Sequence, residues 1–201
     1  MERYWSTEQT VPFSWVQVTS GFWSKYPNPH SEHVFSEDFV EIRILPNGHL
    51  YTKRFLTKTN KLPSWGQHFF STRNVPVVEE VIVDPHQRTM TTYTRNIGLR
   101  YFMGTTQKEV ICPDPVDAHQ TRLKKEVWIN SDMYGFRSAI KKFGIDRFKK
   151  NCASATQGFE WVLRRTYGKG SQVIRNDDLG HRNGLVGHRP NGTLRCDLNS
   201  S

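Results

Sequence analysis

Alternation of apolar and polar residues runs through the first two-thirds of the chain and predicts a series of short strands. The predicted strands are residues 33–45, 50–57, 77–83, 89–96, 101–111 and 121–130. The link between the first two contains Asn47-Gly48, a strong signal for a hairpin turn. The link between the third and fourth begins at Asp84-Pro85, which also favours a turn. Six strands with such short links predict an antiparallel meander.

Helical spacing of apolar residues appears twice. Residues 14–23 predict a short helix for which Ser14 is a good N-cap. Residues 131–166 carry one apolar stripe at helical spacing, although Gly144 and Gly158 weaken it and indicate bends or close backbone contacts. At 1.5 Å per residue this helix would be about 50 Å long, enough to cover one face of the sheet. Strands followed by a long helix predict an α+β fold.

Composition narrows the class of ligand. The 201 residues carry a formal charge of +9, which favours phosphate groups of nucleic acid or lipid as partners. Hydrophobic residues make up 36% of the chain, and aromatic residues alone 12%, so the apolar material is concentrated in large side chains. The three cysteines, Cys112, Cys152 and Cys196, are far apart and support neither a disulfide framework nor a zinc site.

The ends of the chain differ from its middle. No apolar run approaches the roughly 18 residues of a membrane span, and the first residues have neither the apolar core of a signal peptide nor the pattern of an Arg-rich presequence. From Gly168 onward the sequence is rich in glycine and lacks Phe, Trp and Tyr. We therefore expect a folded domain over residues 1–167 and a disordered tail over residues 168–201.

Catalytic motifs are missing from the sequence. It contains no GxSxG, HExxH, P-loop or GxGxxG pattern, and its eight histidines are scattered. The sequence therefore predicts a protein that is not an enzyme and needs no metal or cofactor. Interleaved cations and aromatic residues in strands 51–57 and 89–101 leave an RNA-binding surface as one alternative, although no RNP-like motif is present.

A basic and apolar loop follows the second predicted strand. Lys58 and Lys61 lie directly beside Leu62, Pro63 and Trp65. Proline disfavours helix at the preceding residue, and tryptophan favours a membrane interface. This combination suits an anionic, apolar partner such as a lipid surface. The alternative is a tryptophan in the core beneath a loop with solvated lysines.

Four sequence blocks resemble those of a known family. They are Lys25-Tyr-Pro-Asn-Pro-His with His33-Val34; Arg54-Phe-Leu-Thr-Lys-Thr-Asn-Lys-Leu-Pro-Ser-Trp; Val83-Asp-Pro with Thr89-Met-Thr-Thr-Tyr-Thr and Asn96; and Phe143-Gly, Arg147-Phe148 and Gly158-Phe159-Glu160. Together they resemble the PRELI-like family over about residues 5–166. The second and third blocks are nearer to its PRELI branch than to its Slowmo branch.

The resemblance implies a helix-grip fold, in which a curved antiparallel sheet of about six or seven strands wraps on a long C-terminal helix and leaves a START-like tunnel. It implies transfer of phosphatidic acid between mitochondrial membranes through the intermembrane space, which supports cardiolipin synthesis. It also implies transient membrane contact and a small helical, cysteine-paired partner of the TRIAP/Mdm type.

Residue by residue, the resemblance gives two sets of candidates. Those for binding the lipid head group are Lys25, Arg54, Lys58, Lys61, Arg147 and Lys149, and those for a membrane-contacting lid are Leu62, Pro63 and Trp65. For Lys149 a solvated surface position is the alternative. The chain departs from the family at Ser154 and Gln157, where relatives often carry a basic residue, and weaker or altered lipid binding would follow if either position contacts the head group.

The physical demands on such a carrier are clear. Two acyl chains contain about 30 methylenes, and at ~0.8 kcal/mol each their exposure to water would cost of order 25 kcal/mol. An enclosed apolar tunnel would avoid this cost, and we expect Phe and Trp side chains from the sheet and the long helix to line it. The phosphomonoester needs Lys or Arg donors. A phosphatidylserine carrier with the same fold and a scaffold that moves no lipid remain alternatives.

Overall fold

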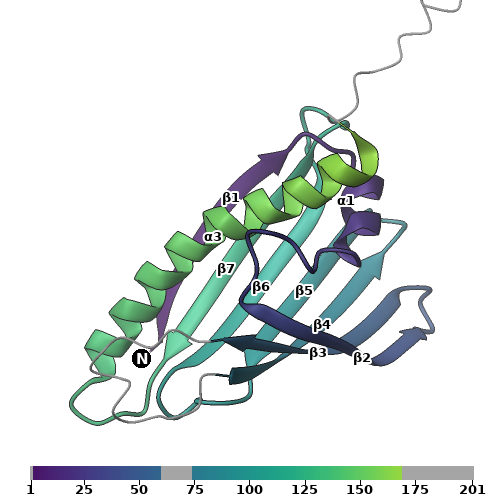
Figure 1. The fold of residues 1–201 in the computed structure, drawn as a ribbon. Coiled ribbons are helices and arrows are strands. Elements are labelled where there is room, and N and C mark those ends of the chain that lie inside the picture. Colours follow the sequence, from purple (N-terminus) through teal and green to yellow (C-terminus); the bar gives the residue numbers. More distant parts are fainter. Residues whose placement is uncertain (1, 60–73, 169–201) are drawn as a thin grey trace, which may run out of the picture. The chain divides into compact units, whose positions relative to one another are not determined.

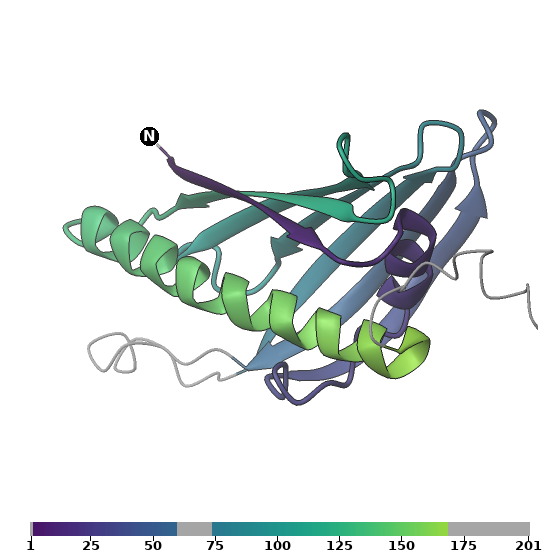
Figure 2. The same ribbon diagram turned by 90° about the horizontal axis from the view of Figure 1, so that it is seen from above.

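A seven-stranded antiparallel sheet and two helices make up the part of the chain described by the computed structural model, residues 2–59 and 74–168. The strands are β1 (Arg3–Val11), β2 (Val34–Ile44), β3 (Leu50–Thr59), β4 (Asn74–Asp84), β5 (Thr89–Asn96), β6 (Gly104–Pro113) and β7 (Thr121–Asn130), and the helices are α1 (Trp15–Phe22) and α3 (Arg137–Tyr167). The strand order is β1-β7-β6-β5-β4-β3-β2. The α+β class and the curved sheet with a long C-terminal helix are confirmed (Figures 1 and 2).

All six predicted strands form, and the turn between β2 and β3 is the expected one. Gly48 has φ +80°, a conformation that glycine adopts without strain, and its N–H donates to the carbonyl oxygen of Leu45 at 2.8 Å. The sixth predicted strand is confirmed as β7, and the fifth begins three residues later than expected. Residues before it form a turn in which Leu99 has φ +59°.

Strand β1 was missed from the sequence. It pairs with β7 along its whole length, from Arg3 opposite Ile129 to Val11 opposite Thr121. The positions of β1 that face α3 include the polar residues Thr7 and Gln9, so the apolar alternation typical of a half-buried strand is absent. Pairing with β7, rather than hydrophobic pattern, defines this edge of the sheet.

The long helix begins later than the sequence pattern indicated. The predicted start at Ser131 is wrong, because residues 131–133 are irregular, residues 134–136 form a turn, and Gly135 has φ +78°, a value incompatible with helix. The end is confirmed: α3 stops at Tyr167, and the N–H of Gly168 donates to the carbonyl oxygen of Arg164 at 2.9 Å. The predicted tail lies outside the described residues from 169 onward, so its boundary and disorder stay predictions. Neither described helix is long and apolar enough to cross a membrane.

Apolar clusters hold α3 to the sheet near both of its ends. Toward its C-terminus, Phe159 and Leu163 join the main core, which also contains α1 and the inward residues of the central strands. Toward its N-terminus, Ile145 and Phe148 pack with Val127 and with other residues of β1 and β7. Figure 2 shows α3 lying along the concave face of the sheet, with α1 beside its C-terminal end.

Helix α1 is fixed by its own cap and by the core. Ser14 accepts from the N–H of Gln17, and the Gln17 side chain accepts from the N–H of Ser14, which completes a capping box. Trp15, Val18 and Phe22 are buried, as the predicted helical face required. The helix therefore positions the loop that follows it, residues 23–33, against α3.

A close contact ties this loop to α3. A Cβ on Gly158 would overlap the Oδ1 of Asn28 and would lie 3.0 Å from the Cβ of His30. Asn28 is buried and fixed, because its Nδ2 donates to the carbonyl oxygen of Lys25 at 2.8 Å and its Oδ1 accepts from the N–H of His30 at 3.0 Å. The glycine therefore marks a close backbone contact, one of the two roles expected from the sequence.

Replacing this glycine should loosen the loop. Alanine is about 1 kcal/mol better than glycine inside a helix, but overpacking against fixed atoms costs about 1–3 kcal/mol. We expect Gly158→Ala to lower the free energy of unfolding by about 1 kcal/mol, which lowers the Tm by a few degrees in thermal unfolding. The exposed neighbour Gln157→Ala is the control and should change the Tm little. A Tm for Gly158→Ala at or above that of the wild type would contradict this packing.

Candidate functional site

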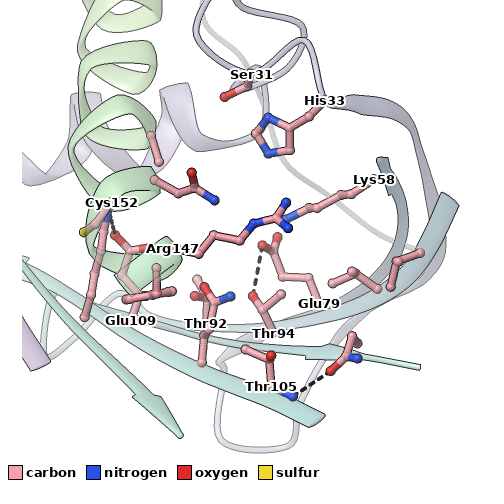
Figure 3. Close-up of a pocket in the computed structure, with 18 of the residues that line it drawn as sticks. Ser31, His33, Lys58, Glu79, Thr92, Thr94, Thr105, Glu109, Arg147 and Cys152 are labelled. Carbon is pink, nitrogen blue, oxygen red and sulfur yellow. Dashed lines mark hydrogen bonds and ion pairs between the residues drawn. The ribbon is translucent and has the colours of Figure 1, made fainter. Parts of the chain in front are cut away.

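A cavity of about 230 Å³ lies between the concave face of the sheet, α3 and the loop that follows α1 (Figure 3). Strands β3 to β7 all contribute to its lining, and α3 contributes residues between Arg147 and Ala155. The ends of β3 and β4 reach it at Thr59 and Val75. Its place between sheet and helix is the one expected for a tunnel.

The sheet register explains which residues face the cavity. Because side chains alternate between the two faces of a strand, every second residue points toward α3. The lining residues that follow this rule are Val75, Val77 and Glu79 on β4, Thr92, Thr94 and Asn96 on β5, Thr105, Gln107 and Glu109 on β6, and Lys125 and Ile129 on β7. The centre of this row is polar.

The expected aromatic lining is largely wrong for the described part of the chain. Phe13, Phe22 and Phe159 fill the main core. Phe148 is the one Phe or Trp side chain among the described residues that lines the cavity. Aliphatic, hydroxyl, amide and charged side chains take most of the remaining positions, so the lining mixes polar and apolar groups and has few aromatic rings.

Positive charge exceeds negative charge in this chamber. Four cationic side chains line it, Lys25, Lys58, Lys125 and Arg147, against the two carboxylates of Glu79 and Glu109, which leaves a formal charge of +2. Lys108 and Glu126 also touch the cavity, but their side chains belong to the opposite face of the sheet. There Lys108 Nζ lies above the ring of Tyr93, and Glu126 accepts from the hydroxyl of Tyr4 at 2.8 Å.

Arg54 lies behind the cavity wall rather than in it. Its side chain is fully buried, its Nε donates to Oε1 of Glu79 at 2.7 Å, and one of its terminal nitrogens donates to Oε2 of Glu37 at 2.6 Å. The guanidinium carbon lies 4.9 Å from the centre of the Phe22 ring. Arg54 is therefore enclosed by two carboxylates and an aromatic face and does not reach the cavity lining.

The two carboxylates beside Arg54 differ in the net direction of their pKa shifts. Burial acts to raise the pKa of Glu79, but the charges of Arg54 and of two cavity lysines outweigh it, and the pKa lies below its ordinary value. Burial raises the pKa of Glu37, and Arg54 offsets this only in part. Glu79 is therefore ionised at neutral pH and faces the cavity as a fixed negative charge.

Lys25 enters the cavity from the loop after α1. Its Nζ lies 5.4 Å from the centre of the Phe22 ring and 5.7 Å from that of Phe159, within the range of cation–π attraction. Burial acts to lower the pKa of Lys25, yet interactions with Tyr26 and two carboxylates outweigh burial, and the pKa lies above its ordinary value. This ammonium is therefore charged at neutral pH.

Three further basic side chains, each from a different part of the fold, also line the cavity. Figure 3 shows Lys58 of β3 and Arg147 of α3 reaching inward toward Glu79, with the ring of His33 above them. Burial, then the charges of Lys58 and Arg147, lower the pKa of His33. Desolvation also lowers the pKa of Arg147. Both shifts disfavour positive charge here, and an anion bound at this place would favour the charged forms.

Lys125 joins the sheet to the helix. Its Nζ lies 3.4 Å from Oε1 of Glu109 and donates to Oγ1 of Thr156 at 3.1 Å, and that hydroxyl donates to Oε1 of Gln9 at 2.6 Å. The side chains of Lys125 and Glu109 are only 12% and 15% exposed. This chain of contacts links α3 to β1, β6 and β7.

Three of the six predicted head-group residues come together in the cavity: Lys25, Lys58 and Arg147. Arg54 is buried beside them, as described above. Lys149 is exposed on α3, outside the cavity lining, with its Nζ 6.0 Å from the centre of the Trp5 ring. The alternative of a surface position describes it better.

The remaining predicted residues are not at the cavity or are not described. Lys61 and the lid candidates Leu62, Pro63 and Trp65 lie outside the described residues, so their roles stay predictions. Ser154 and Gln157, where the chain departs from its family, are exposed on α3 and do not line the cavity.

Sequence reasoning missed the inward polar residues. Glu79, Glu109 and Lys125 lie in predicted strands. Each follows an inward-facing residue by two positions, namely Val77, Gln107 and Leu123, so all of them face the same side of the sheet. Polar residues at inward positions of β4, β6 and β7 were the available signal. It could have been read only with the strand register known.

The described residues contain no metal-binding cluster and no activated cysteine. Across residues 2–59 and 74–168, no group of three or more His, Cys, Asp or Glu could hold a metal ion. Cys112 and Cys152 are free thiols, and burial raises the pKa of both, so neither is an activated nucleophile.

Comparison with known proteins agrees with the architecture and the sequence blocks. The family model described as "PRELI-like family" matches residues 16–169. PRELI domain-containing protein 1, mitochondrial, from Gallus gallus is 40% identical over 172 residues, which are 84% of this chain and 80% of that protein. The human protein of the same name is 37% identical over 84% of this chain and 78% of its own length. Protein UPS1, mitochondrial, from Saccharomyces cerevisiae is 26% identical over 77% of this chain and 89% of its own length.

Solved structures confirm the helix-grip, START-like fold. A protein from Thermus thermophilus matches with a TM-score of 0.57 at 14% identity, covering 82% of this chain and 99% of its own. The Zhui aromatase/cyclase from a Streptomyces species also matches with a TM-score of 0.57, at 11% identity and over 85% of this chain and 99% of its own. At such low identity these likenesses concern the fold alone.

The environment of His33 predicts a pH dependence of stability. Its pKa is lower in the folded protein than the ordinary value near 6.5, so the unfolded chain binds this proton first as the pH falls. Stability from neutral His33 is therefore present above about pH 6.5 and is lost as the pH falls through the folded pKa. We expect the Tm to fall less between about pH 7.5 and 5.5 in His33→Asn than in the wild type. Each variant's Tm at the higher pH is its own reference, and an equal fall in both would contradict the assignment.

Proposed function

The chain belongs to the PRELI-like family, and from this premise we propose that it is a non-enzymatic carrier of phosphatidic acid through the mitochondrial intermembrane space. Membership supports a mitochondrial role in lipid transfer in general, and relatives at 35–40% identity are named as mitochondrial proteins. The choice of phosphatidic acid is our own step. It is supported by the charge of the cavity.

The observation that carries this proposal is the excess of cations over carboxylates among the side chains that line the cavity. The formal charge of +2 from the lining side chains complements a phosphomonoester, which carries up to two negative charges at neutral pH. Arginine and lysine groups bind phosphate oxygens through charge-assisted hydrogen bonds. Because Lys25, Lys58 and Arg147 come from three separate elements, they can surround one phosphate from different sides.

The size of the chamber suits a head group rather than a whole phospholipid. Pockets for drug-sized ligands are roughly 300–1,000 Å³, and this cavity is about 230 Å³. We propose that the glycerol phosphate enters the chamber and that the acyl chains extend past the ends of β3 and β4. Contact of Leu62, Pro63 and Trp65 with the membrane during loading stays a prediction from the sequence.

An exposed apolar edge supports the proposed protein partner. On the edge strand β2, Phe35, Ile42 and Ile44 are each more than 60% exposed. Large exposed apolar side chains on one strand often mark an interaction site. We propose that a small helical, cysteine-paired protein of the TRIAP/Mdm type binds the chain, and that delivery of phosphatidic acid supports cardiolipin synthesis.

Phosphatidylserine is the second candidate cargo. Its ammonium group could pair with a carboxylate, and Glu79 and Glu109 both face the chamber. Its head group combines a phosphodiester and a carboxylate with an ammonium group, so its net negative charge is smaller than that of a doubly ionised phosphomonoester, and the excess of cations favours phosphatidic acid. The two lipids differ enough for direct competition to separate them.

A transfer assay between vesicles tests the proposal. Donor vesicles carry fluorescent phosphatidic acid with a quencher, acceptor vesicles carry neither, and the full chain should accelerate dequenching. Unlabelled phosphatidic acid in the donors should compete better than phosphatidylserine, and phosphatidylcholine should compete least. If no anionic phospholipid moves faster in the presence of the chain, with a co-expressed partner supplied, the proposed function is wrong.

Two cations on the same helix provide a matched pair of variants. Arg147 faces the cavity, and Lys149 is exposed beside Trp5. Loss of a hydrogen bond to a charged group costs about 1.5–3 kcal/mol, so we expect Arg147→Ala to reduce the transfer rate about tenfold or more. Lys149→Ala should stay within about twofold of the wild type. Equal losses in both variants, at unchanged Tm, would mean that the cavity is not the head-group site.

A further inference from the structure

Glu79 holds a negative charge in a chamber that is otherwise suited to anions. Its two oxygens have different surroundings. Oε1 lies 2.7 Å from Nε and 2.6 Å from a terminal nitrogen of Arg54, behind the cavity wall. Oε2 accepts a long bond of 3.4 Å from the hydroxyl of Thr94, which itself lines the cavity. One oxygen is therefore fixed by Arg54, and the other is turned toward the chamber.

The cations of the chamber interact with this carboxylate. Lys25 and Lys58 both contribute to the electrostatic environment of Glu79, and Glu79 contributes in turn to that of Lys25. Figure 3 shows Lys58 and Arg147 directed toward the Glu79 carboxylate. The side chain is 6% exposed, so water screens these interactions weakly. Before any ligand arrives, Glu79 is thus a counter-ion of the same cations that would bind a phosphate.

We infer that Glu79 acts as a resident competitor of the cargo phosphate: it neutralises and orients the cavity cations when the chamber is empty, and it weakens their hold on the phosphate when the chamber is loaded. This inference rests on the proposed function, because it assumes that an anionic phospholipid enters the chamber. Arg54 is then a positioning residue, which keeps Glu79 charged and fixed without touching the lipid.

The consequence concerns release rather than capture alone. A carrier must bind its lipid firmly enough to extract it from one membrane and loosely enough to leave it in the next. A cavity with cations only would satisfy the first requirement and slow the second. Repulsion between the Glu79 carboxylate and the phosphate raises the free energy of the loaded state, so unloading becomes faster.

A simpler account makes Glu79 only the structural partner of buried Arg54. The two accounts differ in the expected sign of a mutation. If Glu79 only stabilises Arg54, its neutralisation lowers stability and leaves or weakens lipid binding. If Glu79 competes with the phosphate, its neutralisation tightens lipid binding. Binding affinity and unloading rate therefore separate them, and stability alone does not.

The test compares the full-length wild type with Glu79→Gln, which keeps the size of the side chain. Binding is measured as the Kd for fluorescent phosphatidic acid in phosphatidylcholine vesicles, and unloading as the rate at which pre-loaded protein delivers that lipid to plain vesicles. We expect Kd to fall about tenfold, equivalent to about 1.4 kcal/mol, and unloading to slow about tenfold. An unchanged or higher Kd for Glu79→Gln would overturn the inference.

Two further variants test whether net charge alone or Arg54 itself accounts for any change in binding. Glu80→Gln makes the same change of charge on the next residue of β4, but that side chain lies on the opposite face of the sheet, where it accepts from the hydroxyl of Tyr51 at 2.9 Å. It should keep Kd within about twofold of the wild type. Equal tightening in Glu79→Gln and Glu80→Gln would show that net charge alone is responsible, and the inference would fail.

Glu79→Gln could unfold because Arg54 loses a charged partner. The double variant Arg54→Gln/Glu79→Gln removes both charges of the pair and keeps the test valid. It should bind phosphatidic acid about as tightly as Glu79→Gln, because Arg54 does not line the cavity. Weaker binding than the wild type would instead mean that Arg54 itself holds the phosphate. If the wild type neither binds nor moves phosphatidic acid, the proposed function fails, and that result is distinct from all of these.

Discussion

The attachment of α3 at its two ends is the constraint on which the cavity depends. Phe159 and Leu163 fix the C-terminal part in the main core, and Ile145 and Phe148 fix the N-terminal part against β1 and β7. Each fully buried side chain of this size contributes about 1.5–3 kcal/mol. A helix held in this way over a curved sheet cannot collapse onto it between the attachments. The space beneath Cys152 and Ala155 therefore stays open, and the fold itself maintains the chamber.

The polar groups in this space are costly for stability and useful for binding. A buried ion pair such as Arg54 with Glu79 gains little over well-packed apolar residues, because both charges lose their hydration. The same holds for Lys125 and Glu109. In exchange, the chamber holds its donors in place before a ligand arrives, so that little side-chain ordering remains to be done on binding. This pattern fits a protein that must recognise one charged group repeatedly and release it each time.

Much of the fold was readable from the sequence, because local signals and burial agreed. The Asn47-Gly48 turn, the N-cap at Ser14 and the apolar stripe of α3 each have a direct counterpart in the structure. Strand β1 was not readable, since its inward positions are polar and only its pairing with β7 defines it. The start of α3 was misjudged because Met133 and Phe136 continue the apolar spacing through a turn.

The candidate site was readable only where sequence blocks marked it. The blocks point to Lys25, Lys58 and Arg147, and all three line the cavity. Arg54 was named with them, but a long-range pairing of β3 with β4 places it beside Glu79 and behind the wall. Glu79 and Lys125 could not be recognised, since their significance depends on which strands lie side by side. Patterns along the chain show which residues face inward, whereas distances between strands decide what those residues contact.

The most direct measurement of the central claim is native mass spectrometry of the full chain after incubation with vesicles that contain equal amounts of phosphatidic acid, phosphatidylserine and phosphatidylcholine. A cationic chamber that holds one head group predicts a single bound phospholipid per chain, with phosphatidic acid predominant. A chain that leaves the vesicles without lipid, or with phosphatidylcholine as often as with phosphatidic acid, would contradict it.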